Sequence, residues 1–314
     1  MMNYTVRDDF QEALAKNLVI VVLGVLINSI NWIIVMTYLN NSVFHTDTRY
    51  ILYIHLVIND MIMVSISVTL YVLTYAYPIF NISICCTLTV IASTTHKITP
   101  LNLAGMAIER YIAICKPLHH GQICTVHRTY ILIGLIWWVG FIPGLTDIVI
   151  LLITKPMSFF STTIFCYPLI LYKSEYYQVK TKVLQALYLS FVWLILICTY
   201  FRIFAVAKKA KGDSSAKKAH NTIMLHGVQL FLCMLSYVSP VLDMILVPFF
   251  PNDRSKITFF SYLITSIVPR LLSSLIYGIR DQTFSKRMSI YCFCKLSIVK
   301  VKPQRKLYPG LSTQ

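Results

Sequence analysis

The chain has 314 residues, of which 57% are hydrophobic and only 13% are charged, and its mean hydropathy is +0.67. Soluble domains carry about 25% charged residues, so this sequence excludes an ordinary soluble protein and predicts an integral membrane protein. The formal net charge of +16 is a property of the loops beside the membrane, and nucleic acid is not an expected partner.

Seven apolar stretches are long enough to cross a bilayer, which takes about 20 mostly apolar residues in a helix. They are residues 17–39, 51–76, 84–115, 129–153, 183–206, 221–248 and 258–278. These runs are too long and too evenly apolar for barrel strands, so the predicted fold class is all-α, a seven-transmembrane helix bundle. After the last span, residues 280–294 alternate basic and apolar side chains, which predicts a short amphipathic helix on the membrane surface.

Charge in the loops orients the predicted bundle. With the N-terminus outside, sixteen loop and tail lysines and arginines fall on the cytoplasmic side and eight on the extracellular side, as the positive-inside rule requires. We therefore expect a multi-pass plasma-membrane protein with an extracellular tail (1–16), a seven-transmembrane domain (17–279) and a cytoplasmic helix and tail (280–314). The tail shows no cleavable signal peptide, and Asn3 begins a glycosylation sequon in it.

The third span ends in residues 106–118, MAIERYIAICKPL, which place Glu109 and Arg110 at the membrane edge. Charges there are costly unless they are paired and used. The run closely resembles the MAxDRYxAIC signature of vertebrate odorant receptors, in the rhodopsin-like family of G-protein-coupled receptors, with Glu109 where that family usually has Asp. With its continuation over 123–130 it looks most like fish odorant receptors. The resemblance covers nearly the whole chain, through Asn28, Asp60, Cys85, Trp137, Trp138 and residues 275–280.

The resemblance implies a small odorant bound in the outer half of the bundle, between spans three, five, six and seven. It also implies a partner G protein of the stimulatory olfactory type, which raises cyclic AMP, in the cilia of olfactory sensory neurons. A non-olfactory rhodopsin-like receptor for a small metabolite or peptide remains an alternative. A transporter would need inverted repeats and broken helices, which the sequence lacks. There is no HExxH, GxSxG or P-loop, so no enzyme, cofactor or metal site is expected.

By the same resemblance, residues 109–111 form a switch for G-protein coupling. Glu109 holds Arg110 in the resting state, beside Tyr111, and activation releases Arg110 to meet the G protein. Tyr200 and Tyr277 match tyrosines that stabilise the active form. Residues 273 and 274 are serines where the family usually has Asn and Pro, so a helix-kinking proline is lost and the hinge is expected to differ.

Asp60 matches the acidic centre of the family's sodium pocket, and Asn28, Thr99 and Ser273 complete the predicted buried polar network. Arg270 lies one helical turn from Ser273 and is expected to point toward Asp60. A carboxylate inside the membrane needs a partner, and a guanidinium is always charged. Our hypothesis is that Arg270 replaces sodium as the counter-ion of Asp60.

The candidates for ligand binding lie in the outer half of spans three and six: Ala92, Ser93, His96, Lys97, Tyr237 and Asp243. Aminergic receptors carry an aspartate at the position of Ala92, so a monoamine is not expected, and the seventh span has no lysine for retinal. Lys97 lies about 18 Å along the helix from Cys85 and about 20 Å from Arg110, near mid-membrane. Two interpretations remain open: an internal salt bridge to Asp147 or Asp243, or an anchor for an acidic or carbonyl ligand.

Four cysteines stand at informative positions. Cys85 opens the third span on the outer side, and Cys166 is the only cysteine of the loop 154–182, so both face an oxidising compartment in which a disulfide would persist. Cys86 competes with Cys85 as the partner of Cys166. The resemblance implies the pair Cys85–Cys166. Cys292 and Cys294 lie near the inner membrane surface, where palmitoylation and two reduced thiols are both open.

Overall fold

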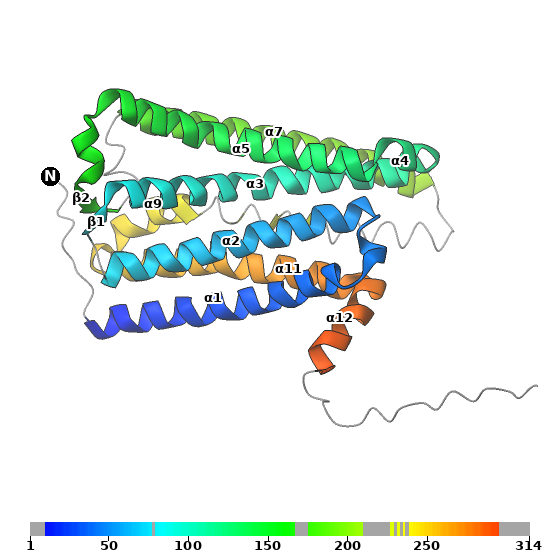
Figure 1. Cartoon of the computed structure of the whole chain (residues 1–314), viewed down its shortest axis with the longest axis horizontal. Helices are drawn as coiled ribbons and strands as arrows, with labels where there is room; N and C mark the ends of the chain where they lie inside the picture. The colour runs from blue at the N-terminus through cyan, green and yellow to red at the C-terminus, as the bar shows by residue number, and fades with distance from the viewer. Residues whose placement is uncertain are drawn as a thin grey trace, which may run out of the picture.

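The apolar runs of the sequence form long helices that lie side by side (Figure 1). In the computed structural model of this chain, the structure is described for residues 10–76, 79–166, 175–209, 227–228, 231–232, 235 and 239–294. Two ends of the bundle are named here by what they hold. The disulfide end holds the Cys85–Cys166 bond and the sheet of β1 (Ile79–Asn81) and β2 (Thr163–Phe165), and the Arg110 end holds α4 (Pro117–Ile123) and α12 (Gln282–Cys294) (Figure 1).

Five long helices make up most of the bundle: α1 (Phe10–Leu39), α2 (Thr48–Ala76), α3 (Ile82–Cys115), α5 (Val126–Thr154) and α7 (Glu175–Lys209). Each begins before its predicted span, and α7 starts eight positions earlier. With 35 residues at 1.5 Å each, α7 is about 52 Å long, so it extends beyond a hydrocarbon core of about 30 Å.

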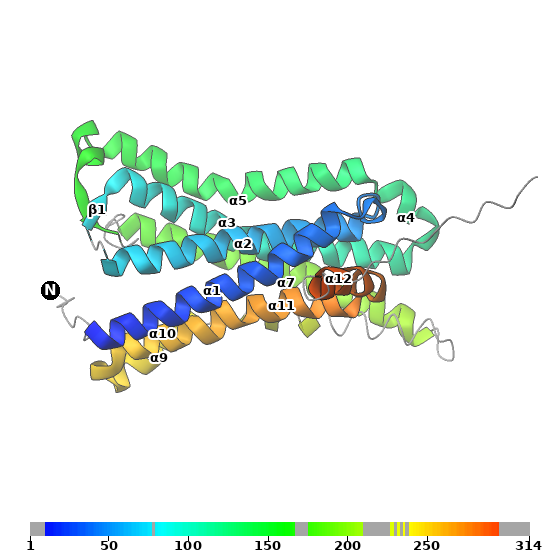
Figure 2. The ribbon, with the colours of Figure 1, turned by 60° about the horizontal axis from the view of Figure 1, so that its bottom comes forward.

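The remaining described elements are short. They are α4 (Pro117–Ile123), α9 (Ser239–Phe249), α10 (Arg254–Tyr262), a π-helical turn (Leu263–Ile267), α11 (Val268–Arg280), α12 (Gln282–Cys294), β1 (Ile79–Asn81), β2 (Thr163–Phe165) and the 3-10 turns Ser42–Phe44, Met157–Ser161 and Pro251–Asp253. The π-helical turn Leu263–Ile267 joins α10 to α11, and the continuous helix that results lies beside α1 (Figure 2). Thirteen of the 28 residues of the sixth predicted span, 221–248, lie outside the described residues, and α9 covers the end of the span.

Length and hydropathy identify five membrane-crossing candidates among the described helices: residues 10–39, 48–74, 126–154, 179–206 and 254–276. The helix α3 is long enough at 34 residues but is not among these five. It packs against α2, α5 and α7, and its polar side chains Thr95, Thr99 and Asn102 are buried. A central helix can carry such residues because its neighbours supply hydrogen-bond partners.

Polar side chains join α2, α3 and α5 inside the apolar bundle. Asn59 Nδ2 donates to Thr95 O and to Thr99 Oγ1, both at 3.0 Å. Asn102 Nδ2 donates to the carbonyl of Leu52 at 3.0 Å. On α5, the Trp137 indole N–H donates to His55 Nε2 at 2.8 Å. The bonds of Asn59 and Asn102 fix the rotation of α3 relative to α2, and the bond of Trp137 fixes α5 against α2.

The disulfide end is held by a covalent bond and a small sheet. Cys85 is bonded to Cys166, with their Cα atoms 5.5 Å apart, and Cys86 is a free, buried thiol. The strands β1 and β2 pair antiparallel, with Asn81 opposite Thr163. Asn81 Oδ1 also accepts the N–H of Ser83 at 2.8 Å and so caps α3. This two-stranded sheet is an addition to the all-helical prediction, because three-residue strands leave almost no periodic signal.

The close approach of α3 and α5 depends on glycine at position 144. A Cβ added there would lie 2.8 Å from Val90 Cγ1, and Val90 is buried and stiff at χ1. We expect Gly144→Ala to lower the melting temperature of the purified protein by several degrees, since overpacking costs about 1–3 kcal/mol.

Gly134→Ala on the same helix is the matched control, because a Cβ there meets no heavy atom within 4 Å. Alanine favours a helix by about 0.8–1 kcal/mol over glycine, so this change should leave the melting temperature equal or higher. Equal melting temperatures for the two variants would contradict the packing account.

Candidate functional site

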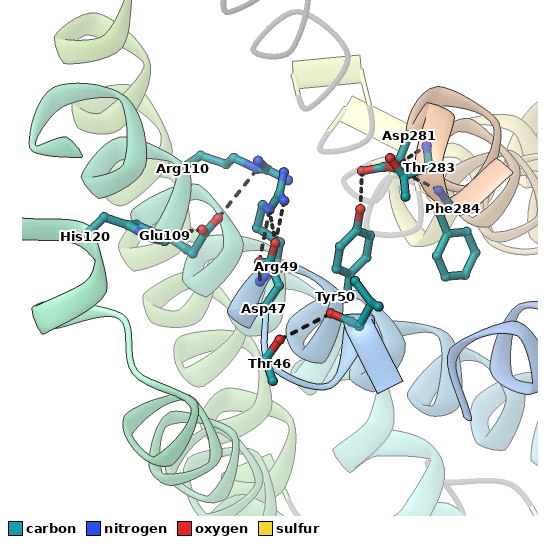
Figure 3. Close-up of polar contacts among 11 residues, drawn as sticks. Thr46, Asp47, Arg49, Tyr50, Glu109, Arg110, His120, Asp281, Thr283 and Phe284 are labelled. Carbon is teal, nitrogen blue, oxygen red and sulfur yellow. Dashed lines mark hydrogen bonds and ion pairs between the residues drawn. The ribbon is translucent and has the colours of Figure 1, made fainter. Parts of the chain in front are cut away.

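Glu109 and Arg110 lie near the last turn of α3, where Pro117 ends that helix and begins α4. Glu109 is only 5% exposed and contacts two cationic or protonatable groups. Its Oε1 lies 2.9 Å from His120 Nε2 on α4, and its Oε2 lies 3.6 Å from Arg110 Nε (Figure 3). A nearly buried carboxylate is thus held between an arginine of its own helix and a histidine of the next one.

A second acid–base pair faces Arg110 from the beginning of α2, with Asp47 directly before that helix and Arg49 in its first turn. Arg49 Nε donates to Asp47 Oδ1 at 3.0 Å and to Oδ2 at 2.9 Å. Burial raises the pKa of Asp47, but the hydrogen bonds and charge of Arg49 outweigh burial, and the charge of Arg110 lowers the pKa further. The pKa of Asp47 therefore lies below its usual value, and the group stays ionised at neutral pH. Arg110 stands between two carboxylates from separate elements (Figure 3).

These groups surround an open cavity of about 630 Å³ at the Arg110 end. Three segments line it: the turn before α2, the end of α3, and the connection from α4 to α5. The lining residues are Thr46, Asp47, Thr48, Arg49, Glu109, Arg110, Ala113, His120, Gly121, Cys124, Thr125 and Val126. The cavity offers two guanidinium groups, each already beside a carboxylate, so a partner entering here competes for ionic contacts.

The first turn of α2 also anchors α12. The hydroxyl of Tyr50 donates to Asp281 Oδ2 at 2.7 Å, and Asp281 Oδ1 accepts the N–H groups of Thr283 and Phe284 at 3.0 Å (Figure 3). Asp281 is thus the N-cap of α12. Phe284 is fully buried, and its ring lies 5.1 Å from that of Phe44 and 5.7 Å from that of Tyr53.

In the middle of the bundle, Arg270 of α11 forms a buried ion pair with Asp60 of α2. Arg270 Nη1 donates to Asp60 Oδ1 and lies 3.4 Å from Thr99 Oγ1 on α3, and Thr99 Oγ1 also lies 3.5 Å from Asp60 Oδ1. Ser273 Oγ donates to the carbonyl of Arg270 at 3.1 Å. A sodium ion at this carboxylate would meet the guanidinium, so these residues do not fit a cation.

The predicted ligand-binding candidates are brought together only in part. Ala92, Ser93, His96 and Lys97 lie half-buried on α3, and Ser93 Oγ donates to the carbonyl of Val90 at 3.0 Å. Asp243 lies half-buried on α9, with Oδ1 buried and unbonded. Tyr237 lies outside the described residues.

The other predicted site residues lie in several places. Asn28 Nδ2 of α1 donates to Ser65 Oγ of α2 at 3.0 Å. Its partner on α2 is thus Ser65 and not Asp60. Tyr111 is half-buried on α3, and the Tyr200 ring stacks on Phe204 of its own helix, with 6.3 Å between centroids. Outside the described part of the chain lie Asn3 and the side chains of Tyr277, Cys292 and Cys294.

The comparisons with known proteins identify the family of this bundle. Residues 30–275, from within α1 to α11, match the family described as 7 transmembrane receptor (rhodopsin family). The chain belongs to this family. The seven-helix fold class is thereby confirmed, as are the multi-pass membrane protein and the expectation of a receptor that is not an enzyme.

Relatives of this rhodopsin-family receptor are odorant and olfactory receptors. It is 29% identical over 287 residues to Odorant receptor 131-2 of Danio rerio, which covers 91% of this chain and 88% of the relative. It is 25% identical over 211 residues to Olfactory receptor 11H7 of Homo sapiens, 63% of each chain. With Olfactory receptor 4K15 of Homo sapiens it shares 25% over 198 residues, 60% of this chain and 57% of the relative.

Several residues of the receptor's Arg110 end were not predicted from the sequence. Asp47, Arg49 and His120 lie in short connections, where no helical period indicates which side chains meet. Asp281 had a usable signal, because an Asp directly before a predicted helix is a common N-cap. Toward the disulfide end, Lys180 falls within the predicted loop 154–182 but lies on α7, which begins at Glu175, and it pairs there with Asp147.

The docking of α12 gives a prediction for this site. Phe284→Ala should detach α12 from the bundle, because truncating a buried Phe costs about 3–5 kcal/mol. Amide hydrogen exchange over residues 282–294 should become faster. Ile290→Ala on the same helix is the control, since Ile290 is 50% exposed. Unchanged exchange in Phe284→Ala would show that α12 does not depend on this contact.

Proposed function

We propose that this receptor is an odorant receptor, which binds a small molecule in the half of the bundle toward the disulfide end and activates a stimulatory heterotrimeric G protein. The proposal draws on the name of its zebrafish relative, which aligns over 91% of this chain. The ligand site is placed among Ala92, Ser93, His96, Lys97, Tyr237 and Asp243. Binding there shifts the population toward a state that opens the Arg110 end.

One observation supports this proposal above the others: the arrangement around Arg110. Glu109 and Asp47 hold the ionic contacts of Arg110 and Arg49, beside an open cavity. A shift of α3 relative to the turns that flank it separates Glu109 from His120 and Arg110 from the charge of Asp47, and the side chain of Arg110 can then rotate away from Glu109. Arg110 is then free to meet the G protein, with Tyr111, Tyr200 and Tyr277 assisting the active form.

The orientation of the receptor follows from its charge. We infer that the Arg110 end is cytoplasmic, because the loops on that side carry sixteen lysines and arginines against eight on the other side. The disulfide end and the sequon at Asn3 are then extracellular. In this orientation the ligand enters from the side of the Cys85–Cys166 bridge, and the cavity beside Arg110 faces the G protein.

The test is cyclic AMP in cells expressing the wild type and Arg110→Ala, challenged with acids, alcohols, amines, amino acids and bile-acid-like odorants. The wild type should respond to at least one class, and Arg110→Ala should lose that response at equal surface expression. Glu109→Gln should raise ligand-free cyclic AMP, because the neutral amide holds Arg110 and His120 less strongly than a carboxylate does.

Ile108→Ala serves as the control, since Ile108 neighbours Glu109 but is exposed on the outer face of α3. A wild-type response in Arg110→Ala would contradict the switch. A surface-expressed wild type that is silent to the whole panel would overturn the odorant assignment and favour a non-odorant ligand or another G protein.

A further inference from the structure

Three helices bring charged side chains to the half of the bundle toward the disulfide end: Asp147 of α5 forms an ion pair with Lys180 of α7, and both act electrostatically on Lys97 of α3. The helix α3 packs against both α5 and α7 (Figure 1). Two of these groups are basic and one is acidic. Since charges inside a membrane are costly unless paired, the balance within this group decides what it can bind.

The carboxylate of the group is already engaged. Lys180 Nζ forms an ion pair with Asp147 Oδ1, and it lies 3.4 Å from Thr146 Oγ1. Both side chains of the pair are 13% exposed. The Lys180 ammonium also lies 5.5 Å from the centroid of the Tyr177 ring. Asp147 and Lys180 therefore neutralise each other and leave the charge of Lys97 unbalanced.

Lys97 forms no ion pair with any residue in the described ranges. It lies 12 positions after Cys85, about 18 Å along α3, so its ammonium cannot reach the membrane surface. The carboxylate whose charge acts on it is Asp147, which is already paired with Lys180. Of the two interpretations of Lys97, the internal salt bridge lacks a partner among these residues.

Below Lys97 the same three helices close into an apolar cluster. Its buried members are Ile98, Leu101, Ala104, Ala107, Ile136, Val192 and Leu196. This cluster separates Lys97 from the Arg110 end. Lys97 thus stands at the floor of the charged group, where a polar head arriving from the disulfide end would stop.

We propose that Lys97, with Lys180 nearer the disulfide end, binds the carboxylate of a small monocarboxylic acid. The inference rests on the proposed function and names the ligand class for that site. One carboxylate added to two ammonium groups and Asp147 brings the net charge to zero. An alcohol of the same chain leaves Lys97 unpaired, and an amine adds a like charge, so both bind less well.

The test measures binding without signalling. The melting temperature of the purified receptor is measured with straight-chain carboxylic acids, and with alcohols and amines that have the same number of carbons. Acids alone should raise the melting temperature of the wild type and of Lys97→Arg, and Lys97→Met should lose that rise. In cells, Lys97→Met should raise the half-maximal acid concentration by about tenfold to a hundredfold, as expected for a charge-assisted hydrogen bond.

The ligand-free melting temperature separates the two interpretations of Lys97. Lys97→Met removes an unbalanced cation, so it should melt at the wild-type temperature or above it. A lower value, with no acid effect in the wild type, would show a structural salt bridge and overturn the proposal.

Two further outcomes separate the ligand class from the proposed function. Acid binding without cyclic AMP would uphold the carboxylate site while the signalling assignment fails. Signalling only by non-acidic odorants, unchanged in Lys97→Met, would overturn the carboxylate site while the odorant receptor stands.

Discussion

The constraint on which this structure depends is the neutralisation of charge inside the membrane. Asp60 and Arg270 meet that constraint with each other: both are buried, and they join α2 to α11 across Thr99 of α3. A buried carboxylate that loses its partner is destabilising by about 3–5 kcal/mol. The pair therefore fixes how α11 lies against α2 and α3.

The same constraint divides α3 into regions with different roles. Near Cys85 the helix is held covalently to the loop that carries Cys166. In its middle, Thr99 belongs to the neutral Asp60–Arg270 pair, while Lys97 has no such counterpart in the described residues. At its end, Glu109 and Arg110 meet polar partners from two connections. The charges at the centre of α3 are thus paired within the bundle. Lys97 and Arg110 are the charged groups proposed to bind a ligand and a G protein.

The sequence was a good guide wherever a long period or a membrane rule applied. The helices, the fold class and the approach of Arg270 to Asp60 follow from apolar length and from the cost of an unpaired charge. The sequence was a poor guide to the contacts made by the short segments that connect the long helices. Asp47 and His120 gather around residues 109 and 110 because the segments before α2 and after α3 fold over the end of α3. The spacing of residues along the sequence does not specify that arrangement.

The most direct test of the central pair is the melting temperature of four purified proteins: wild type, Asp60→Asn, Arg270→Gln and the double variant, each in sodium chloride and in choline chloride. The account predicts that Arg270→Gln melts well below the wild type, that Asp60→Asn with Arg270→Gln recovers part of the loss, and that sodium leaves the wild type unchanged. A double variant no more stable than Arg270→Gln, or a wild type stabilised by sodium, would contradict the account.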